Sequence, residues 1–428
     1  MKKTTVFTTL VVCLLASSSP MMGQTQTTPA VADKPVLTDA TVPDPFRPLY
    51  QELDESLRQA QQLYPFQKGN ARPLIAPSLA MASSFYSPSA ADPQRWNDLL
   101  ATLDAFKAMR MNAVSVEIAA PDLALGDTES LLDFYQRLAA EIHARHMKLY
   151  VEHFFNTPFE PNTPPHKHSH KDILAAKTFQ DNPQGRQEFL NILEQENTLI
   201  YREIKPDYLS ILTEPQVSTR LMLHLTFTAD ELARWVGDLT TRLKNTGASP
   251  GTLLGAGALT YESEDFVLKF AQQANLDYVD MHVYSLKMKD EDQVAKLTAL
   301  VGKVRESRPN MPVTIGEAWL FKNGKAGPKA PYPEIFARDN FSLWSPLDAQ
   351  FLKLLMGIAQ KENISVVAPS FSQYFFAYYT LGDAESSRLP PWPHSIPQSW
   401  NKAFEAVRNH QLSPTGKAIS AMLEPAAK

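Results

Sequence analysis

The chain has 428 residues, of which 44% are hydrophobic and 20% are charged, so a largely disordered chain is excluded. Its 41 Lys and Arg residues against 46 Asp and Glu residues give a formal net charge of −5. A protein that binds the phosphate backbone is normally basic, so we expect no nucleic-acid partner.

The N-terminal segment has the pattern of an export signal. Lys2 and Lys3 precede an apolar stretch over residues 6–16, and small residues follow it. This stretch is too short to span a bilayer, which takes about 20 residues. We therefore predict a signal peptide at 1–23, a Thr- and Pro-rich linker at 24–46, and a periplasmic or secreted protein with no stable membrane insertion of the mature chain.

The only cysteine of the chain is Cys13, which lies inside that apolar stretch. Cleavage of the signal would remove it. We therefore expect the mature chain to contain no disulfide, no zinc thiolate and no thiol nucleophile.

A helical pattern over 47–64, with leucines at 49, 53 and 57, predicts an N-terminal helix within a lead-in segment at 47–72. This helix would either plug or flank the main domain. From residue 73 to 428 short apolar runs alternate with longer amphipathic segments. The predicted strands are 74–80, 113–118, 148–153, 208–212, 252–256, 278–283, 313–316 and 365–369. The predicted helices are 93–110, 129–146, 184–204, 229–246, 262–274, 290–306, 347–361 and 397–424.

Strands that alternate with helices predict parallel βαβ units, and eight such units predict an α/β fold of the (β/α)8 TIM barrel type, as a single catalytic domain. The alternative is a doubly wound open sheet. That fold usually has fewer units and a Gly-rich phosphate turn after its first strand, and no such turn is present here.

The active sites of such barrels lie at the C-terminal ends of the strands. The fourth predicted strand is followed by Glu214 in a Thr-Glu-Pro sequence, and the seventh ends at Glu317 in Ile-Gly-Glu-Ala-Trp. The sixth strand ends with His282 and Tyr284. Two carboxyl groups that face each other suit glycosidic bond cleavage, because one protonates the leaving oxygen and the other attacks the anomeric carbon.

With these motifs the chain resembles the retaining glycoside hydrolases of the (β/α)8 clan A, which include cellulases, mannanases and galactanases. The resemblance implies that Glu214 is the general acid/base and Glu317 the nucleophile. It also implies that the hydroxyl of Tyr284 orients Glu317 and that His282 lies at the substrate. A carbohydrate partner and no cofactor follow from the same resemblance.

The chain departs from the clan pattern in three places. The Asn that usually precedes the acid/base is Thr213, which offers the sugar only a hydroxyl. No arginine ends the second strand, whose last residues include Glu117. The aromatic residue expected after strand eight is not obvious, and Tyr374 is one candidate.

Other side chains near strand ends have two interpretations each. Glu117 and Glu152 either form structural contacts or hydrogen-bond a substrate hydroxyl. His153 either lines the site or is a buried, hydrogen-bonded histidine. Trp319 either stacks on a sugar face or packs in the core.

Three histidines at alternate positions, His166, His168 and His170, follow the third strand. They suggest a metal-dependent barrel hydrolase as one alternative function, although we expect no metal site. A second alternative is a barrel that binds carbohydrate without cleaving it, which Thr213 favours.

Overall fold

The computed structural model describes residues 42–425 with several gaps. The gaps are residue 71, 87–90, 126–127, 156–178, 262–263, 274, 289–290, 326–337 and 383–394. The predicted signal peptide, most of the predicted linker and the three loop histidines therefore lie outside the described residues. Within the described part, no helix is both long and apolar enough to cross a membrane.

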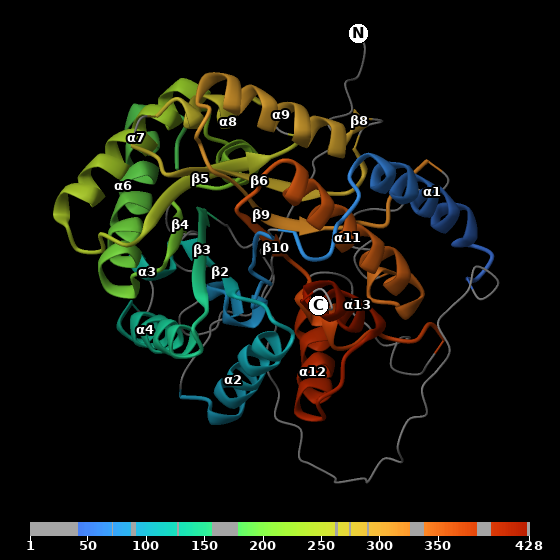
Figure 1. Cartoon of the computed structure of the whole chain (residues 1–428). Helices are drawn as coiled ribbons and strands as arrows, with labels where there is room; N and C mark the ends of the chain where they lie inside the picture. The colour runs from blue at the N-terminus through green and yellow to red at the C-terminus, as the bar shows by residue number, and fades with distance from the viewer. Residues whose placement is uncertain are drawn as a thin grey trace.

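Eight parallel strands form one sheet that curls into a barrel (Figure 1). They are β1 (Leu74–Ile75), β2 (Ala113–Ala120), β3 (Lys148–Phe155), β4 (Tyr208–Ser210), β5 (Leu253–Leu259), β6 (Tyr278–Tyr284), β9 (Val313–Trp319) and β10 (Val366–Pro369). The sheet order is β1-β10-β9-β6-β5-β4-β3-β2, so chain neighbours are sheet neighbours throughout. A small antiparallel pair, β7 (Lys287–Met288) and β8 (Glu291–Asp292), follows β6.

The ring closes just beyond β1. Ser78 forms a parallel bridge with Ser115 of β2. The backbone N–H of Leu79 donates to the Ser115 carbonyl at 2.9 Å, and the Ser115 N–H donates to the Pro77 carbonyl at 3.0 Å. The predicted (β/α)8 barrel is therefore confirmed, and the open sheet is excluded.

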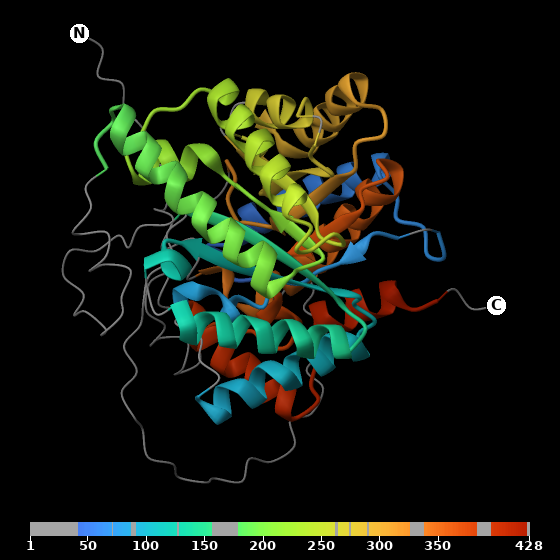
Figure 2. The same cartoon turned by 90° about the vertical axis from the view of Figure 1, so that its left-hand side faces the viewer.

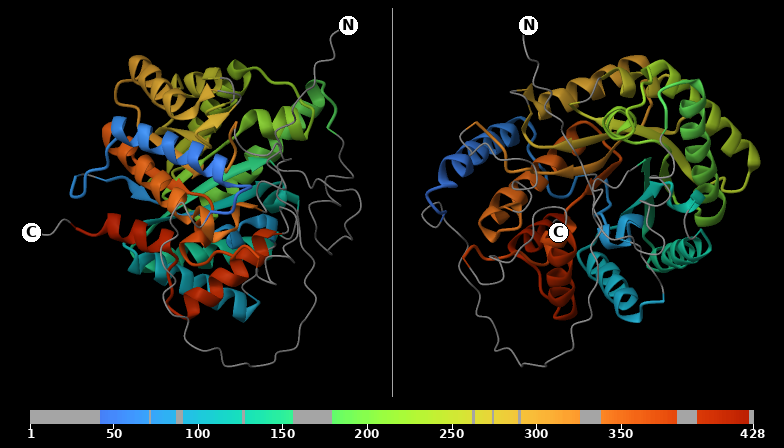
Figure 3. Two further views of the ribbon diagram at one scale, coloured as in Figure 1. Left: turned by 90° about the vertical axis from the view of Figure 1, so that its right-hand side faces the viewer. Right: turned by 180° about the vertical axis from the view of Figure 1, so that it is seen from behind.

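Helices surround the barrel (Figures 1 and 3). They are α1 (Arg47–Leu63), α2 (Pro93–Ala108), α3 (Asp122–Leu125), α4 (Thr128–Ala144), α6 (Pro183–Leu199), α7 (Ala229–Thr246), α8 (Glu264–Ala271), α9 (Gln293–Ser307), α11 (Ser345–Lys361), α12 (Ser395–Arg408) and α13 (Pro414–Leu423). Short 3₁₀ or π turns are η2 (Ala80–Ala82), η3 (Ser84–Tyr86), η4 (Ile200–Ile204), η5 (Val217–Met222), η6 (Ser342–Trp344) and η7 (Ser372–Phe375). On one side of the barrel α2, α4 and α6 run alongside one another (Figure 2).

The single helix predicted at 397–424 was wrong, because this segment forms α12 and α13. His410 adopts a positive φ of 53°, which ends α12. Ser413 then caps α13 by accepting from the backbone N–H of Gly416, and Pro414 occupies the first helical turn, where no N–H donor is needed.

The N-terminal helix flanks the barrel instead of plugging it. The leucines of α1 at 49, 53 and 57 are buried, and α1 packs beside α11 (Figure 1). Tyr50 stacks on Trp344 with ring centroids 6.1 Å apart, and the Gln61 amide donates to the Gln350 carbonyl at 2.7 Å.

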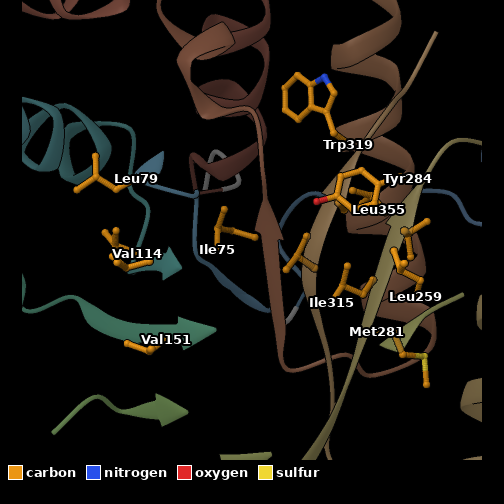
Figure 4. Packing of buried hydrophobic residues seen from close by; sticks show 14 of the residues in the cluster. Ile75, Leu79, Val114, Val151, Leu259, Met281, Tyr284, Ile315, Trp319 and Leu355 are labelled. Carbon is orange, nitrogen blue, oxygen red and sulfur yellow. The ribbon is translucent and has the colours of Figure 1, made fainter. Parts of the chain in front are cut away.

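Two separate cores fill the domain. A large cluster lies between the strands and the helices, with Val151, Met281, Ile315 and others in it (Figure 4). A smaller cluster inside the barrel contains Tyr150 and Tyr278 with small residues from neighbouring strands. Since these aromatic rings fill the barrel interior near the N-terminal ends of the strands, a cavity can form only toward the C-terminal ends.

Candidate active site

Acidic side chains from several strands point into the upper part of the barrel. Successive strand residues face opposite sides, so Tyr150 and Glu152 of β3 share the inner face. Asp280, His282 and Tyr284 share the inner face of β6 in the same way. Glu117 pairs in register with Glu152 across the β2–β3 ladder. The alternation of side chains along the strands therefore places three carboxyl groups near His282, and Glu317 of β9 is the fourth.

Glu317 reaches the inside through a bulge in β9. Met281 of β6 pairs with Ile315, but the next residue, His282, pairs with Glu317, so Gly316 is an extra residue. Without this bulge, regular alternation would turn Glu317 toward the helices. A Cβ atom at Gly316 would lie only 2.1 Å from Oε1 of Glu152, so a residue without a side chain is required there.

Glu214 enters from the loop after β4. It has a positive φ of 47°, a left-handed conformation that is uncommon for residues other than glycine, Asn and Asp. Strained backbone of this kind clusters at functional sites. Its Oε1 lies 2.8 Å from Nδ1 of His282, and that same nitrogen is 3.9 Å from Oε1 of Glu317.

These two distances limit the separation of the Glu214 and Glu317 oxygens to about 6.7 Å. A retaining pair is about 5–5.5 Å apart, and an inverting pair needs about 6.5–9.5 Å. The bound admits the spacing of a retaining pair.

His282 is fully buried among carboxylates. Its Nε2 lies 3.2 Å from Oδ2 of Asp280 and 3.5 Å from Oε1 of Glu152. Burial alone would lower the pKa of His282, but the nearby carboxylates of Glu152 and Glu317 outweigh burial and hold that pKa well above its usual value. The ring is therefore an imidazolium that donates through both nitrogens.

Asp280 is the best-satisfied carboxylate of the group. Its Oδ1 accepts from the Thr314 hydroxyl at 2.6 Å and from the Gly316 backbone N–H at 2.7 Å. Its Oδ2 faces the charged ring of His282. Asp280 thus fixes the bulge and the imidazolium together.

A cavity opens above this group. Its described lining combines aromatic rings with carboxyl groups and a few hydroxyls. The lining residues are Ala80, Tyr86, Glu117, Phe154, Thr213, Glu214, Tyr284, Glu317, Phe321, Ser370, Phe371, Gln373 and Ile396. Flat apolar faces with a few polar groups suit a ligand that has both C–H and hydroxyl surfaces.

The structure brings Glu214, Glu317, Thr213, Tyr284 and Glu117 to the cavity, with His282 directly beneath. The expected bond from Tyr284 to Glu317 is not formed. Its hydroxyl lies 3.3 Å from Oγ of Ser370, because its ring stacks on Phe321 with centroids 4.6 Å apart.

Three other residues that were predicted to contact the substrate lie away from the cavity. Trp319 is 1% exposed, lies in the hydrophobic cluster and packs 5.6 Å from Tyr374 (Figure 4). Tyr374 is also buried, and its hydroxyl donates to Asn340 at 2.9 Å. His153 points outward to α6, where its Nε2 lies 2.8 Å from Glu196. All three are core residues, which was the alternative interpretation for His153 and Trp319.

Sequence reasoning missed Asp280, Ser370 and Phe321. Asp280 carried a usable signal, because it lies two residues before His282 and must share its face. Ser370 and Phe321 lie just after strands, where sequence alone does not say which side chain turns inward.

Glu152, His282 and Glu317 are the one set in the described part of the chain whose side-chain atoms all lie within 4.8 Å, as metal ligands would. A metal needs a neutral imidazole with a free lone pair. Both ring nitrogens of His282 face carboxylates and carry protons, so the set does not fit a metal ion.

Glu117 makes the stability of the protein depend on pH. Burial, followed by the neighbouring carboxyl groups of Glu152 and Glu214, raises the pKa of Glu117 from 4.5 to about 8. Between pH 4.5 and about pH 8, Glu117 is protonated in the folded state and ionised in the unfolded state. Its contribution to the free energy of unfolding is therefore complete below about pH 4.5 and is lost as the pH rises to about 8.

We expect Glu117→Gln, which cannot ionise, to raise the melting temperature more at pH 9 than at pH 5. Thermal unfolding at both pH values measures this difference. Glu306→Gln is the matched control, because Glu306 is exposed on α9. An equal shift at both pH values for Glu117→Gln would contradict the argument.

No protein-family model matches the chain, and no match was found among curated proteins. Among solved structures, the chain is similar to a GH5_18 from Bifidobacterium longum subsp. infantis, at 15% identity and a TM-score of 0.50, over 84% of this chain and 81% of that chain. It is also similar to a glycoside hydrolase family 30 subfamily 8 xylanase from Clostridium acetobutylicum, at 15% identity and a TM-score of 0.41, over 71% and 65%. Fungal beta-1,4-galactanases match at 11% identity and a TM-score of 0.44, over 78% and 100%. The first of these supports the barrel fold, and at such identities the likeness concerns the fold alone.

Proposed function

We propose that this protein is a secreted retaining glycosidase that acts on a β-linked glycan or glycoside. The observation that carries the proposal is that Glu214 and Glu317 line one cavity and lie 2.8 Å and 3.9 Å from the same ring nitrogen of His282. The resemblance of the strand ends to clan A supports the β linkage. The pattern at residues 1–23 supports secretion.

In the first step the carboxylate of Glu317 attacks the anomeric carbon, and Glu214 gives its proton to the glycosidic oxygen as that bond breaks. The product is a glycosyl ester on Glu317. In the second step Glu214 takes a proton from water, the water oxygen attacks the anomeric carbon, and the ester bond breaks. Two displacements at one carbon retain its configuration, and no cofactor is required.

Covalent labelling tests this function. The protein would be incubated with a panel of 2-fluoro-glycosyl inactivators, digested and analysed by mass spectrometry. We expect a sugar on the peptide that carries Glu317, and the sugar that labels narrows the substrate class. A label on another residue would refute the assignment of the nucleophile.

The second candidate function is a barrel that binds carbohydrate without cleaving it. Thr213 favours it, because its hydroxyl lies 3.5 Å from the carbonyl oxygen of His153 and is 1% exposed, which leaves it poorly placed to donate to a sugar. Calorimetry with Glu214→Gln protein and aryl glycoside turnover by the unmodified protein separate the two. Binding without any turnover would support this second candidate.

A further inference from the structure

Glu152 is a fully buried carboxyl group with no donor. Its exposure is 0%, and in the described part of the chain neither of its oxygens has a hydrogen-bond partner. An ionised carboxylate without donors is among the most costly groups to bury. Its position is nevertheless built into the fold, because the missing side chain at Gly316 leaves the space that Oε1 of Glu152 occupies.

His282 does not supply the missing hydrogen bond. Its Nε2 proton goes to Asp280 at 3.2 Å, whereas Glu152 is at 3.5 Å. Asp280 also accepts from the Thr314 hydroxyl and the Gly316 N–H, so Asp280 is the better-satisfied acceptor on this side of the ring. Glu152 is left facing Glu317, with side-chain oxygens within 4.8 Å.

Two carboxyl groups can form a hydrogen bond only when one of them carries a proton. We propose that Glu152 is a protonated carboxylic acid that donates its O–H to Glu317 and so positions Glu317 as an ionised carboxylate. Glu152 is thus a positioning residue for the proposed glycosidase, on which the inference rests. Of the two carboxyls Glu317 keeps the charge, because its side chain is 14% exposed at the cavity and Glu152 is sealed from solvent.

Burial raises the pKa of both Glu152 and Glu317, as expected for two carboxyl groups that share one proton, and the greater exposure of Glu317 places the charge there. For Glu152 the charge of His282 opposes the effect of burial on the pKa. The titratable groups that interact with it are Glu117 on β2, Tyr150 on β3, Tyr278, Asp280 and His282 on β6, and Glu317 on β9. With Glu152 neutral, the imidazolium still has Asp280 at 3.2 Å and Glu317 at 3.9 Å beside it.

The experiment compares Glu152→Gln with Glu152→Ala. A glutamine amide has the shape of a protonated glutamate and still donates, so we expect kcat within about threefold of the unmodified protein. Alanine removes the donor, and kcat should fall roughly 10- to 100-fold with little change in KM. The substrate is the aryl glycoside of whichever sugar labels the protein. Equal losses in both variants would overturn the proposal, because they would mean that the charge of Glu152 is needed.

A second measurement does not depend on activity. Protein labelled with ¹³C at glutamate carboxyls would be compared with the same protein carrying Glu152→Gln at pH 7. We expect the resonance that disappears to have the chemical shift of a protonated carboxyl group. If the resonance that Glu152→Gln removes has the chemical shift of an ionised carboxylate, the inference is overturned, even if glycosidase activity is present. If no substrate is found, this arm still decides the protonation of Glu152.

Discussion

Glu317→Ala is expected to lower kcat on an activated aryl β-glycoside by about 10⁴-fold or more, because it removes the group that forms the covalent bond. The side chain is held at the cavity by the β9 bulge, and the strand ladder is independent of its carboxyl group. The folded structure should therefore survive the change. Glu306→Ala, at an exposed position of α9, is the control and should keep full activity.

Sodium azide sharpens this experiment. In Glu317→Ala protein, azide can enter the vacated space and attack the face opposite the leaving group, which gives a glycosyl azide of inverted configuration. In Glu214→Ala protein the ester on Glu317 still forms from an activated substrate, and azide then attacks it with net retention. NMR of the two products identifies both roles. A retained azide from Glu317→Ala would show that the roles are not as proposed.

Asp280→Ala is expected to cost about 3–5 kcal/mol of stability, the typical loss when one member of a buried ion pair is removed. The variant would leave the imidazolium of His282 without its closest carboxylate on the Nε2 side and the N–H of Gly316 without an acceptor. Urea unfolding measures the loss as a lower midpoint at unchanged slope.

Asp280→Asn is the matched variant for this test. Its amide oxygen still accepts from Gly316 and Thr314, and only the negative charge is lost. We expect its loss of stability to lie between zero and that of Asp280→Ala. A cost below about 1 kcal/mol for Asp280→Ala, the size of one neutral hydrogen bond, would contradict the ion-pair argument.

The barrel could be predicted because a parallel strand that is covered on both faces reads as a short apolar run. β5 and β6 were recovered in this way, and so were the amphipathic helices between strands. The division of the last helix was less visible, since α12 and α13 are both amphipathic and only Ser413 and Pro414 mark the break.

The candidate site was predicted only in part, because sequence alone does not show which residues of a strand face the inside of the barrel. Strand ends placed Glu214 and Glu317 at the barrel mouth. Glu152 and His153 are neighbours, and sequence alone does not say which one faces inward. The ladder with β4 settles it, because Tyr150 lies inside the barrel against Ser210. The bulge at Gly316 could not be placed before its partners in β6 were known.

The ladder between β1 and β10 has a consequence for synthesis. The Ser372 hydroxyl donates to the carbonyl of Ser78, 294 residues earlier in the chain, and β1 has its ladder with β10. A ribosome that adds about 5–20 residues per second needs roughly 15–60 s to make the intervening chain. During that interval the edge of β1 that later pairs with β10 has no neighbour. We therefore expect translation speed and chaperone supply to affect the yield of folded protein, because the first strand stays unpaired on one edge until the last strand has been made.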